Sequence, residues 1–198
     1  MAEPRFSIGD AVRFGWTTAT KNLGLFLMAM IIVVMISIFP VFFDSALVAF
    51  VSWVLSIVVT LGIMRLGLRF VDGGRGELAD LFANIPLIVS YLIASIIVAI
   101  IVTVGFLLLV IPGIYLGLRL QFYPWSIIDK ESGPVGSVEH SWTITRGSAW
   151  QLFLFAIVLF FVNVLGLLAL GVGLLVTVPL SLVAFAHVYR SLEGSTGG

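Results

Sequence analysis

Several apolar runs in this sequence are long enough for a helix to cross a lipid bilayer, which takes about 20 residues. Of the 198 residues, 61% are hydrophobic and only 10% are charged. A typical soluble domain has about 25% charged residues. Because so few charged side chains cannot cover a folded surface in water, lipid must surround most of this chain. The sequence therefore predicts an all-α, polytopic membrane protein.

We expect six transmembrane helices that belong to a single domain over residues 1–198. The outer turns contain Asp44-Ser45, Pro112-Gly113 and Gly171-Val172-Gly173, and turns this short predict three antiparallel hairpins. The fourth span is the shortest of the six. The predicted spans are Leu23–Phe43, Ala46–Phe70, Ile85–Ile111, Gly113–Ile128, Ala149–Leu170 and Val172–Leu192.

Positive charge predicts how these spans are oriented. Short loops on the cytoplasmic side of a membrane carry an excess of Lys and Arg. With six spans, all ten Lys and Arg residues fall on one side, and the other side carries only Asp44. Both termini and the two long loops are therefore predicted to be cytoplasmic. The ten residues are Arg5, Arg13, Lys21, Arg65, Arg69, Arg75, Arg119, Lys130, Arg146 and Arg190.

An amphipathic helix is predicted over residues 7–22, before the first span. Ser7 can cap this helix, and Asp10 stands three residues later, as in a capping box. Its apolar positions recur at helical spacing and form one face, which can lie in the headgroup plane of the cytoplasmic leaflet. These positions are Ile8, Ala11, Val12, Gly15, Trp16 and Ala19.

A similar pattern recurs further along the chain. Residues 15–22 resemble residues 141–147 with one residue deleted, and both segments lead into a predicted span. Residues 62–69 resemble residues 113–119 in the same way. An interfacial helix followed by a hairpin is therefore predicted three times, over residues 7–72, 77–131 and 134–192. Chance similarity between short apolar segments is the alternative explanation.

The most distinctive stretch runs from Ile111 to Gly147. Its characteristic residues are Ile111-Pro112-Gly113-Ile114-Tyr115, Arg119, Tyr123-Pro124, Asp129, Gly133-Pro134, Ser141-Trp142 and Thr145-Arg146-Gly147. This pattern resembles an uncharacterised bacterial family of integral membrane proteins, related to the membrane domain of some glycerophosphoryl diester phosphodiesterases. The resemblance covers most of the chain and implies a polytopic inner-membrane protein with no agreed activity. The soluble phosphodiesterase domain is absent, so its activity is not carried over.

Arg119 is the charged residue deepest in a predicted span. It lies about 9 Å below the Pro112-Gly113 turn and about 15 Å from Asp129, at 1.5 Å per helical residue. An arginine at such depth is costly and marks a candidate functional site. Candidate partners are Asn163, Gln121, a tyrosine hydroxyl or a lipid phosphate. Alternatively, the hairpin is shallow and Arg119 reaches past an aromatic interface to water.

Arg65 and Arg69 lie four residues apart, on one helix face. The simpler interpretation is that these two arginines anchor the cytoplasmic end of the second span. The sharper hypothesis is an inner-leaflet pocket for anionic lipid, because the arginine fork suits phosphate and basic pockets between spans bind such headgroups. The lipid-binding residues predicted for this pocket are Arg65, Arg69, Arg119, Arg146, Lys21, Trp16 and Trp142.

Catalytic and cofactor motifs are not recognisable in this sequence. There is no cysteine, and His140 and His187 lie on different predicted elements. We expect Asp129, Glu131 and Glu139 to be solvated loop acids. The net charge of zero gives no case for nucleic-acid binding. No metal and no cofactor are therefore expected.

The expected function is that of a non-catalytic inner-membrane protein in bacterial envelope maintenance. It would act through anionic lipid or through membrane-protein partners, including a second copy of itself. The main alternative is a small transporter or channel with a polar route past Arg119 and Asn163. A lipid-modifying enzyme and an obligate subunit of a larger complex are further possibilities. Asn163 and Gln121 are the candidate intramembrane polar residues, and hydrogen bonding between helices is the simpler role for Asn163.

Overall fold

The computed structural model describes residues 5–43, 45–169 and 171–195, and the regular secondary structure in these ranges is helical throughout. Three short 3-10 helices accompany the α-helices: η1 (Phe39–Phe42), η2 (Leu78–Phe82) and η3 (Ile85–Leu87). The α-helices are α1 (Ile8–Lys21), α2 (Leu23–Ile38), α3 (Ala46–Val71), α4 (Ile88–Leu108), α5 (Val110–Leu120), α6 (Tyr123–Lys130), α7 (Pro134–Ile144), α8 (Ala149–Leu168) and α9 (Leu174–Gly194).

Five helical segments of the described ranges are long and apolar enough to cross a membrane. By length and composition, they confirm the prediction of an all-helical membrane protein. The segments are Leu23–Phe42, Ala46–Val71, Leu78–Leu108, Ala149–Leu168 and Leu174–Gly194. Asp44, predicted to be the only charge on the outer side, lies outside the described residues.

The prediction of a fourth span over Gly113–Ile128 is wrong, because these residues do not form one helix. They are divided between α5, of 11 residues, and α6, of 8 residues. A helix of 11 residues is about 16 Å long, which is shorter than the hydrocarbon core of about 30 Å. Pro124 lies in the first turn of α6, where its missing N–H and its ring oppose a continuous helix through Phe122 and Tyr123.

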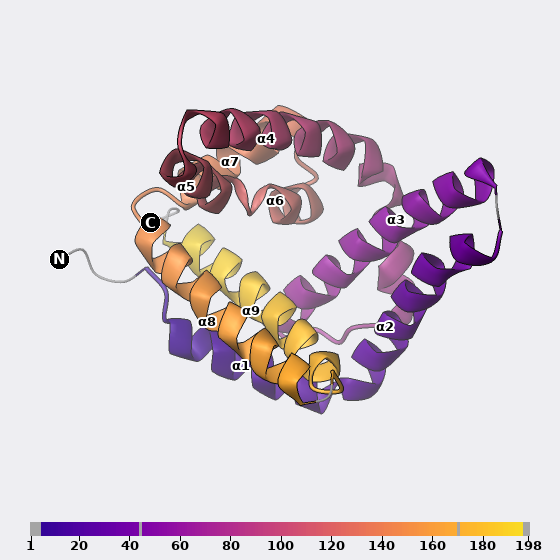
Figure 1. The fold of residues 1–198 in the computed structure, drawn as a ribbon. Helices are drawn as coiled ribbons and strands as arrows, with labels where there is room; N and C mark the ends of the chain where they lie inside the picture. The colour runs from indigo at the N-terminus through magenta and orange to yellow at the C-terminus, as the bar shows by residue number, and fades with distance from the viewer. Residues whose placement is uncertain (1–4, 44, 170, 196–198) are drawn as a thin grey trace.

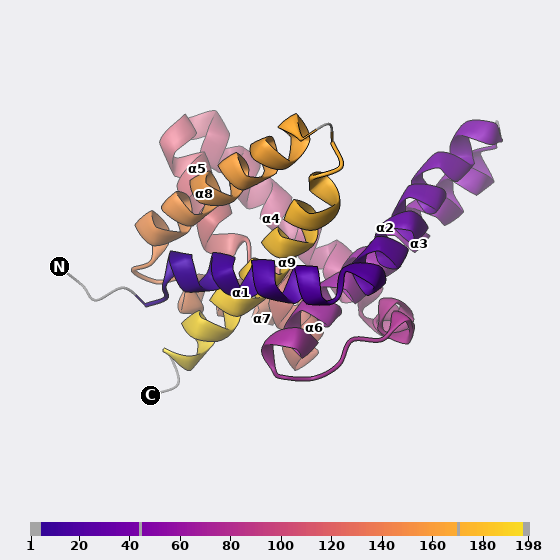
Figure 2. The same ribbon diagram turned by 90° about the horizontal axis from the view of Figure 1, so that it is seen from below.

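Three helix pairs form between neighbours in the chain. They are α2 with α3, α4 with the shorter α5, and α8 with α9. Figure 1 shows the pairs around the middle of the molecule, and Figure 2 shows their connected ends pointing to one side. We call this side the turn side. Helices α6 and α7 and the loop that follows α3 lie on the opposite side, which we call the charged end.

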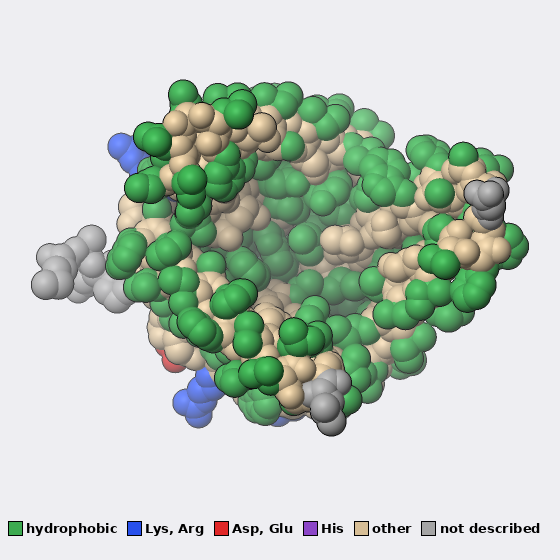
Figure 3. Space-filling model, viewed as in Figure 1, with side chains coloured by type: hydrophobic (Ala, Val, Ile, Leu, Met, Phe, Trp, Pro, Cys, Tyr) green, Lys and Arg blue, Asp and Glu red, His purple; other side chains and the backbone are tan. Residues whose placement is uncertain are grey.

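The turn side presents apolar surface. In Figure 3, which views the molecule from this side, Lys and Arg side chains appear only at the margin. Large side chains near the connections are strongly exposed, among them Val41 (81%), Leu107 (81%) and Ile111 (80%). Such exposure is stable only in an apolar solvent, since soluble proteins rarely expose large contiguous apolar patches.

The core lies towards the charged end, where the pairs converge. Its largest fully buried side chains include Tyr189, Phe122 and Phe155. Trp125 and Leu192 belong to the same cluster. The three helix pairs are therefore packed together at one end and spread apart at the other.

Helix α1 packs across α9. The Ser7 hydroxyl accepts a hydrogen bond from the Asp10 N–H at 3.2 Å and so caps the helix. A Cβ atom at Gly15 would lie 2.5 Å from the carbonyl oxygen of Leu180, so only glycine permits this close approach. The face predicted to meet the headgroups thus packs partly against protein, with Ala11 and Ala19 fully buried.

Candidate functional site

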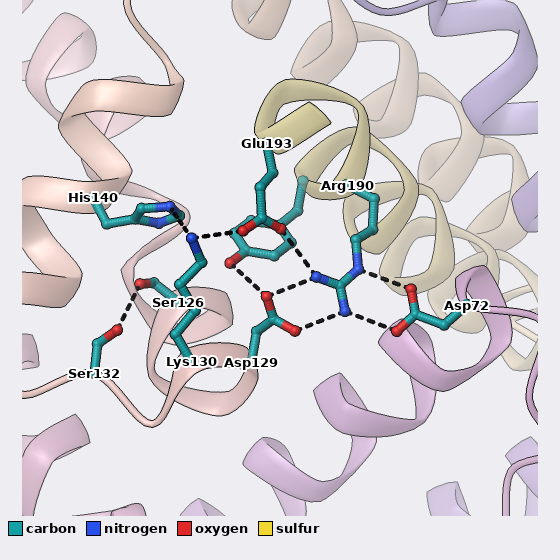
Figure 4. Close-up of polar contacts among 9 residues, drawn as sticks. Asp72, Ser126, Asp129, Lys130, Ser132, His140, Arg190 and Glu193 are labelled. Carbon is teal, nitrogen blue, oxygen red and sulfur yellow. Dashed lines mark hydrogen bonds and ion pairs between the residues drawn. The ribbon is translucent and has the colours of Figure 1, made fainter. Parts of the chain in front are cut away.

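Arg190 of α9 is the centre of the largest charged cluster in the described structure (Figure 4). Its guanidinium donates to both carboxylate oxygens of Asp129, at 2.7 Å each. It also donates to Asp72, at 2.9 and 2.7 Å, and to Glu193, at 3.0 Å. Two bidentate pairs with carboxylates are strong, charge-assisted interactions. One cation therefore links α3, α6 and α9.

A second layer of polar contacts surrounds Asp129 and Glu193. The Tyr189 hydroxyl donates to Asp129 at 3.1 Å, and Lys130 forms an ion pair with Glu193 at 2.7 Å. Nζ of Lys130 also lies 2.9 Å from Nε2 of His140. Burial and the neighbouring Lys130 ammonium lower the pKa of His140 below its ordinary 6.5. His140 is therefore the neutral acceptor for this ammonium.

The acids of this cluster occupy matching positions in the chain. Asp72 caps the C-terminal end of α3, Asp129 lies in the last turn of α6, and Glu193 lies in the last turn of α9. These are the ends of the three segments that return to the charged end. The prediction that Asp129 is a solvated loop acid is wrong, because its side chain is 14% exposed and bound by Arg190.

A small polar cleft of about 160 Å³ lies beside this cluster. Arg65, Arg69 and Arg190 line it together with Asp72 and Asp129. Three cations and two carboxylates therefore face this cleft. In the described part of the chain, no group of His, Asp or Glu side chains has the geometry to hold a metal ion.

Arg119 of α5 lies in a different environment and is 96% buried. Its Nε donates to the Thr145 hydroxyl at 2.9 Å, and its Nη1 donates to the Tyr115 hydroxyl at 2.8 Å. Its Nη2 donates to the carbonyl oxygen of Trp142, whose ring centroid lies 3.9 Å from the guanidinium carbon. The side chain therefore joins α5 to α7 through neutral acceptors and an aromatic face.

The backbone around Arg119 reinforces the same junction. Ser141 and Thr145 of the α7 segment donate from their hydroxyls to the Arg119 carbonyl oxygen, at 2.9 and 3.0 Å. The Ser141 hydroxyl in turn accepts from the Phe122 N–H at 3.1 Å, at the break between α5 and α6. Of the predicted partners, the structure assigns Arg119 a tyrosine hydroxyl. The contribution of Trp142 as a partner was not foreseen.

Arg65 and Arg69 bind the loop that follows α3. Arg65 donates to the amide oxygen of Asn84 at 2.7 Å, and Arg69 pairs with Asp80 at 2.9 Å. Asn84 is fully buried and donates to the carbonyl oxygen of Leu61, so it fixes the loop on α3. The two arginines therefore have partners different from those of Arg119, with which they were predicted to form one pocket.

Four other predicted lipid-binding residues lie on the surface. Trp16 and Trp142 are 52% and 40% exposed. Lys21 and Arg146 are exposed, and neither has an ion-pair partner among the residues that the structure describes. These four side chains are thus accessible from outside, although the Trp142 ring also covers the enclosed Arg119.

The two predicted intramembrane amides are only partly satisfied. Asn163 donates to the Leu159 carbonyl oxygen and to the Ser181 hydroxyl, both at 2.8 Å, and so links α8 to α9. Its Oδ1 and the Nε2 of Gln121 are buried without a hydrogen-bond partner in the described structure. The interhelical hydrogen bond agrees with the simpler role expected for Asn163.

Comparison with known proteins gives one match. The model of the family described as "Domain of unknown function (DUF7847)" matches residues 47–193, which is most of the chain. No curated protein and no solved structure matches the chain. The matched range contains both the Arg190 cluster and the Arg119 site, whereas α1 and α2 precede it.

Proposed function

We propose that this chain, which belongs to the DUF7847 family, is a non-catalytic integral membrane protein that binds anionic lipid at its charged end. The setting we propose is the bacterial inner membrane, as the resemblance of residues 111–147 implies. There the protein would act in envelope maintenance, through lipid or through membrane-protein partners that include a second copy of itself.

One observation carries this proposal: protein groups hold some of the basic side chains and not others. Arg69, Lys130 and Arg190 are paired with acids, and neutral groups bind Arg5, Arg65 and Arg119. Four further basic residues are exposed, and their side chains have neither a hydrogen-bond nor an ion-pair partner among the described residues. They are Arg13, Lys21, Arg75 and Arg146. Each such residue near an anionic leaflet contributes about 1 kcal/mol of attraction.

Exposed tryptophans accompany two of these unpaired charges. Trp142 precedes Arg146 by four residues, and Trp16 follows Arg13 by three. Tryptophan prefers the headgroup level of a bilayer, where its ring is amphipathic. The combination of free basic residues with exposed tryptophan supports a surface that meets lipid headgroups.

We also propose that the three helix pairs enter the membrane from the charged end as hairpins. The middle pair would return through α5 alone, which is too short to span the bilayer. This arrangement keeps both termini on the charged end, which the excess of Lys and Arg places in the cytoplasm. An interfacial helix or turn, α1, η2 or α7, would precede each hairpin, as expected for a threefold repeat.

The experiment that tests lipid binding compares phosphatidylglycerol with neutral phosphatidylcholine by native mass spectrometry of the protein in mixed micelles. The parent should retain phosphatidylglycerol preferentially. The Lys21→Ala/Arg75→Ala/Arg146→Ala variant should lose most of this preference, and the matched Glu131→Gln/Glu139→Gln variant should keep it. Equal retention of both lipids by the parent would overturn the proposal.

The alternative function is a small transporter or channel. Figure 3 shows the turn side hollowed between the helix pairs, which is the observation in its favour. Arg119 and Asn163 would line the route, although each is held by separate partners on α7 and α9. Anion flux into vesicles that is lost in an Asn163→Ala variant would favour this alternative.

A further inference from the structure

A groove between α1, α8 and α9 combines apolar walls with Arg13, which has no ion-pair partner among the described residues. It has a volume of about 590 Å³. Its wall on α8 is formed by Val158, Val162 and Leu165, which recur along one face of the helix over about 10 Å. Arg13 and Trp16 of α1 line the other side. Acyl chains fit such a wall, and a headgroup fits the side that faces Arg13.

A second cavity, of about 380 Å³, lies on the other side of Arg13. Asp10, Thr17, Phe14 and His187 line it together with Arg13. The two cavities therefore share Arg13, with an apolar compartment on one side and a polar compartment on the other. An amphipathic ligand with its phosphate at Arg13 would occupy both compartments.

Asp10 and Arg13 lie one helical turn apart on α1, on the same face. Neither side chain has an ion-pair partner within the described residues. The polar compartment thus offers one free cation and one free carboxylate. Arg13 suits a phosphate, and Asp10 suits a primary ammonium that can donate hydrogen bonds.

We propose that this double groove is a specific site for an aminophospholipid such as phosphatidylethanolamine. Its phosphate binds Arg13, its ammonium binds Asp10, and its acyl chains lie along α8. Of the unpaired cations proposed to attract anionic lipid, the site contains Arg13, whereas Lys21, Arg75 and Arg146 lie outside it. This proposal depends on the proposed function in one respect, which is that the chain lies in a bilayer.

The test is native mass spectrometry in micelles that contain equal amounts of phosphatidylethanolamine, phosphatidylcholine and phosphatidylglycerol. The parent should retain one phosphatidylethanolamine in preference to phosphatidylcholine, whose quaternary ammonium cannot donate to Asp10. Arg13→Ala should reduce this retention about tenfold, since one charge-assisted hydrogen bond is lost. Asp10→Asn should abolish the preference over phosphatidylcholine.

Two further variants keep the result interpretable. Arg75→Ala removes another exposed cation, which does not line the groove, and should leave phosphatidylethanolamine retention unchanged. Arg13→Lys keeps the charge without the fork and should give intermediate retention, with the thermal midpoint of the parent. The proposal is overturned if Arg13→Ala and Arg75→Ala behave alike, or if Asp10→Asn leaves the headgroup preference intact. Neither outcome bears on the phosphatidylglycerol experiment above.

Discussion

Arg119 and Arg190 both lie on helices that return to the charged end, but they are stabilised in different ways. Arg190 is 27% exposed in its side chain and binds three carboxylates from α3, α6 and α9. Arg119 is 4% exposed, and in the described structure its partners are hydroxyls, a backbone carbonyl and aromatic rings. The first arginine neutralises acids that are 14% to 47% exposed, whereas the second has no counter-charge to lose.

This difference predicts how each site responds to substitution. Removing one partner of a buried ion pair leaves an uncompensated charge, which costs more than losing the interaction itself. Removing a cation that is held by neutral groups leaves only unsatisfied dipoles, which cost less. The more buried arginine should therefore be the less important one for stability.

Arg190→Ala should have the largest effect of the substitutions considered. It leaves Asp129 and Glu193 without their shared cation and should lower the free energy of unfolding by about 3 kcal/mol, at the lower end for buried pairs because Arg190 is partly exposed. Thermal unfolding in detergent measures this loss. An unchanged midpoint would mean that the three helix ends are held by apolar packing alone.

Substitutions of single carboxylates make this prediction more specific. Asp129→Asn should destabilise more than Asp72→Asn, because the side chain of Asp129 is 14% exposed and that of Asp72 is 47% exposed. Arg190→Lys is the matched control, since it keeps the charge but cannot form two bidentate pairs. Its midpoint should lie between those of the parent and Arg190→Ala.

Arg119→Met should have a smaller effect, of about 1 kcal/mol. Methionine fills a similar apolar volume, and the Thr145 hydroxyl retains its hydrogen bond to the Ser141 carbonyl oxygen at 2.7 Å. The same thermal measurement applies, with Arg190→Met as the direct comparison. If Arg119→Met proves as destabilising as Arg190→Met, the contrast between the two sites is wrong.

Acid pH should produce the smallest effect, through His140. Its pKa is lowered in the folded state, chiefly by burial and then by Lys130, so the unfolded chain binds more protons near pH 6. The resulting stability is complete above pH 6.5 and is lost as the pH falls towards the folded-state pKa. A His140→Gln variant should be less sensitive to pH between 7 and 5. Equal sensitivity of the variant and the parent would assign the acid response to other groups.

Sequence reasoning found Arg119 but missed the role of Arg190. A single arginine inside an apolar run stands out, because nothing nearby in the sequence explains it. Arg190 lies near the end of a span, where a positive-inside anchor is the ordinary interpretation. Glu193 is a local partner three residues away, but Asp129 and Asp72 are 61 and 118 residues away, so no local pattern connects them to Arg190. The signal in the sequence for this cluster was that Asp72, Asp129 and Glu193 each lie at the end of a segment that returns to the charged end.

The prediction of one lipid pocket did not consider protein acceptors for its arginines. Arg65 and Arg69 share a helix face, as expected, but Asn84 and Asp80 occupy their guanidinium groups. Asp80 lies in η2, where an interfacial helix was expected to begin the 77–131 unit, and Asn84 follows it. Which cations remain free for lipid is a property of the packed loop, and residue spacing alone does not predict it.

The sequence by itself determined that the chain suits a lipid environment, that it is helical and that its charges gather on one side. These properties depend on the composition and order of many residues together. Composition and run length decide whether lipid must surround a chain, and no particular contact changes that outcome. Tertiary structure alone decided that Gly113–Ile128 is broken, that α1 lies on α9, and which arginines are neutralised. These features depend on single close approaches, such as Gly15 on Leu180 and Arg190 on Asp129, between residues far apart in the sequence.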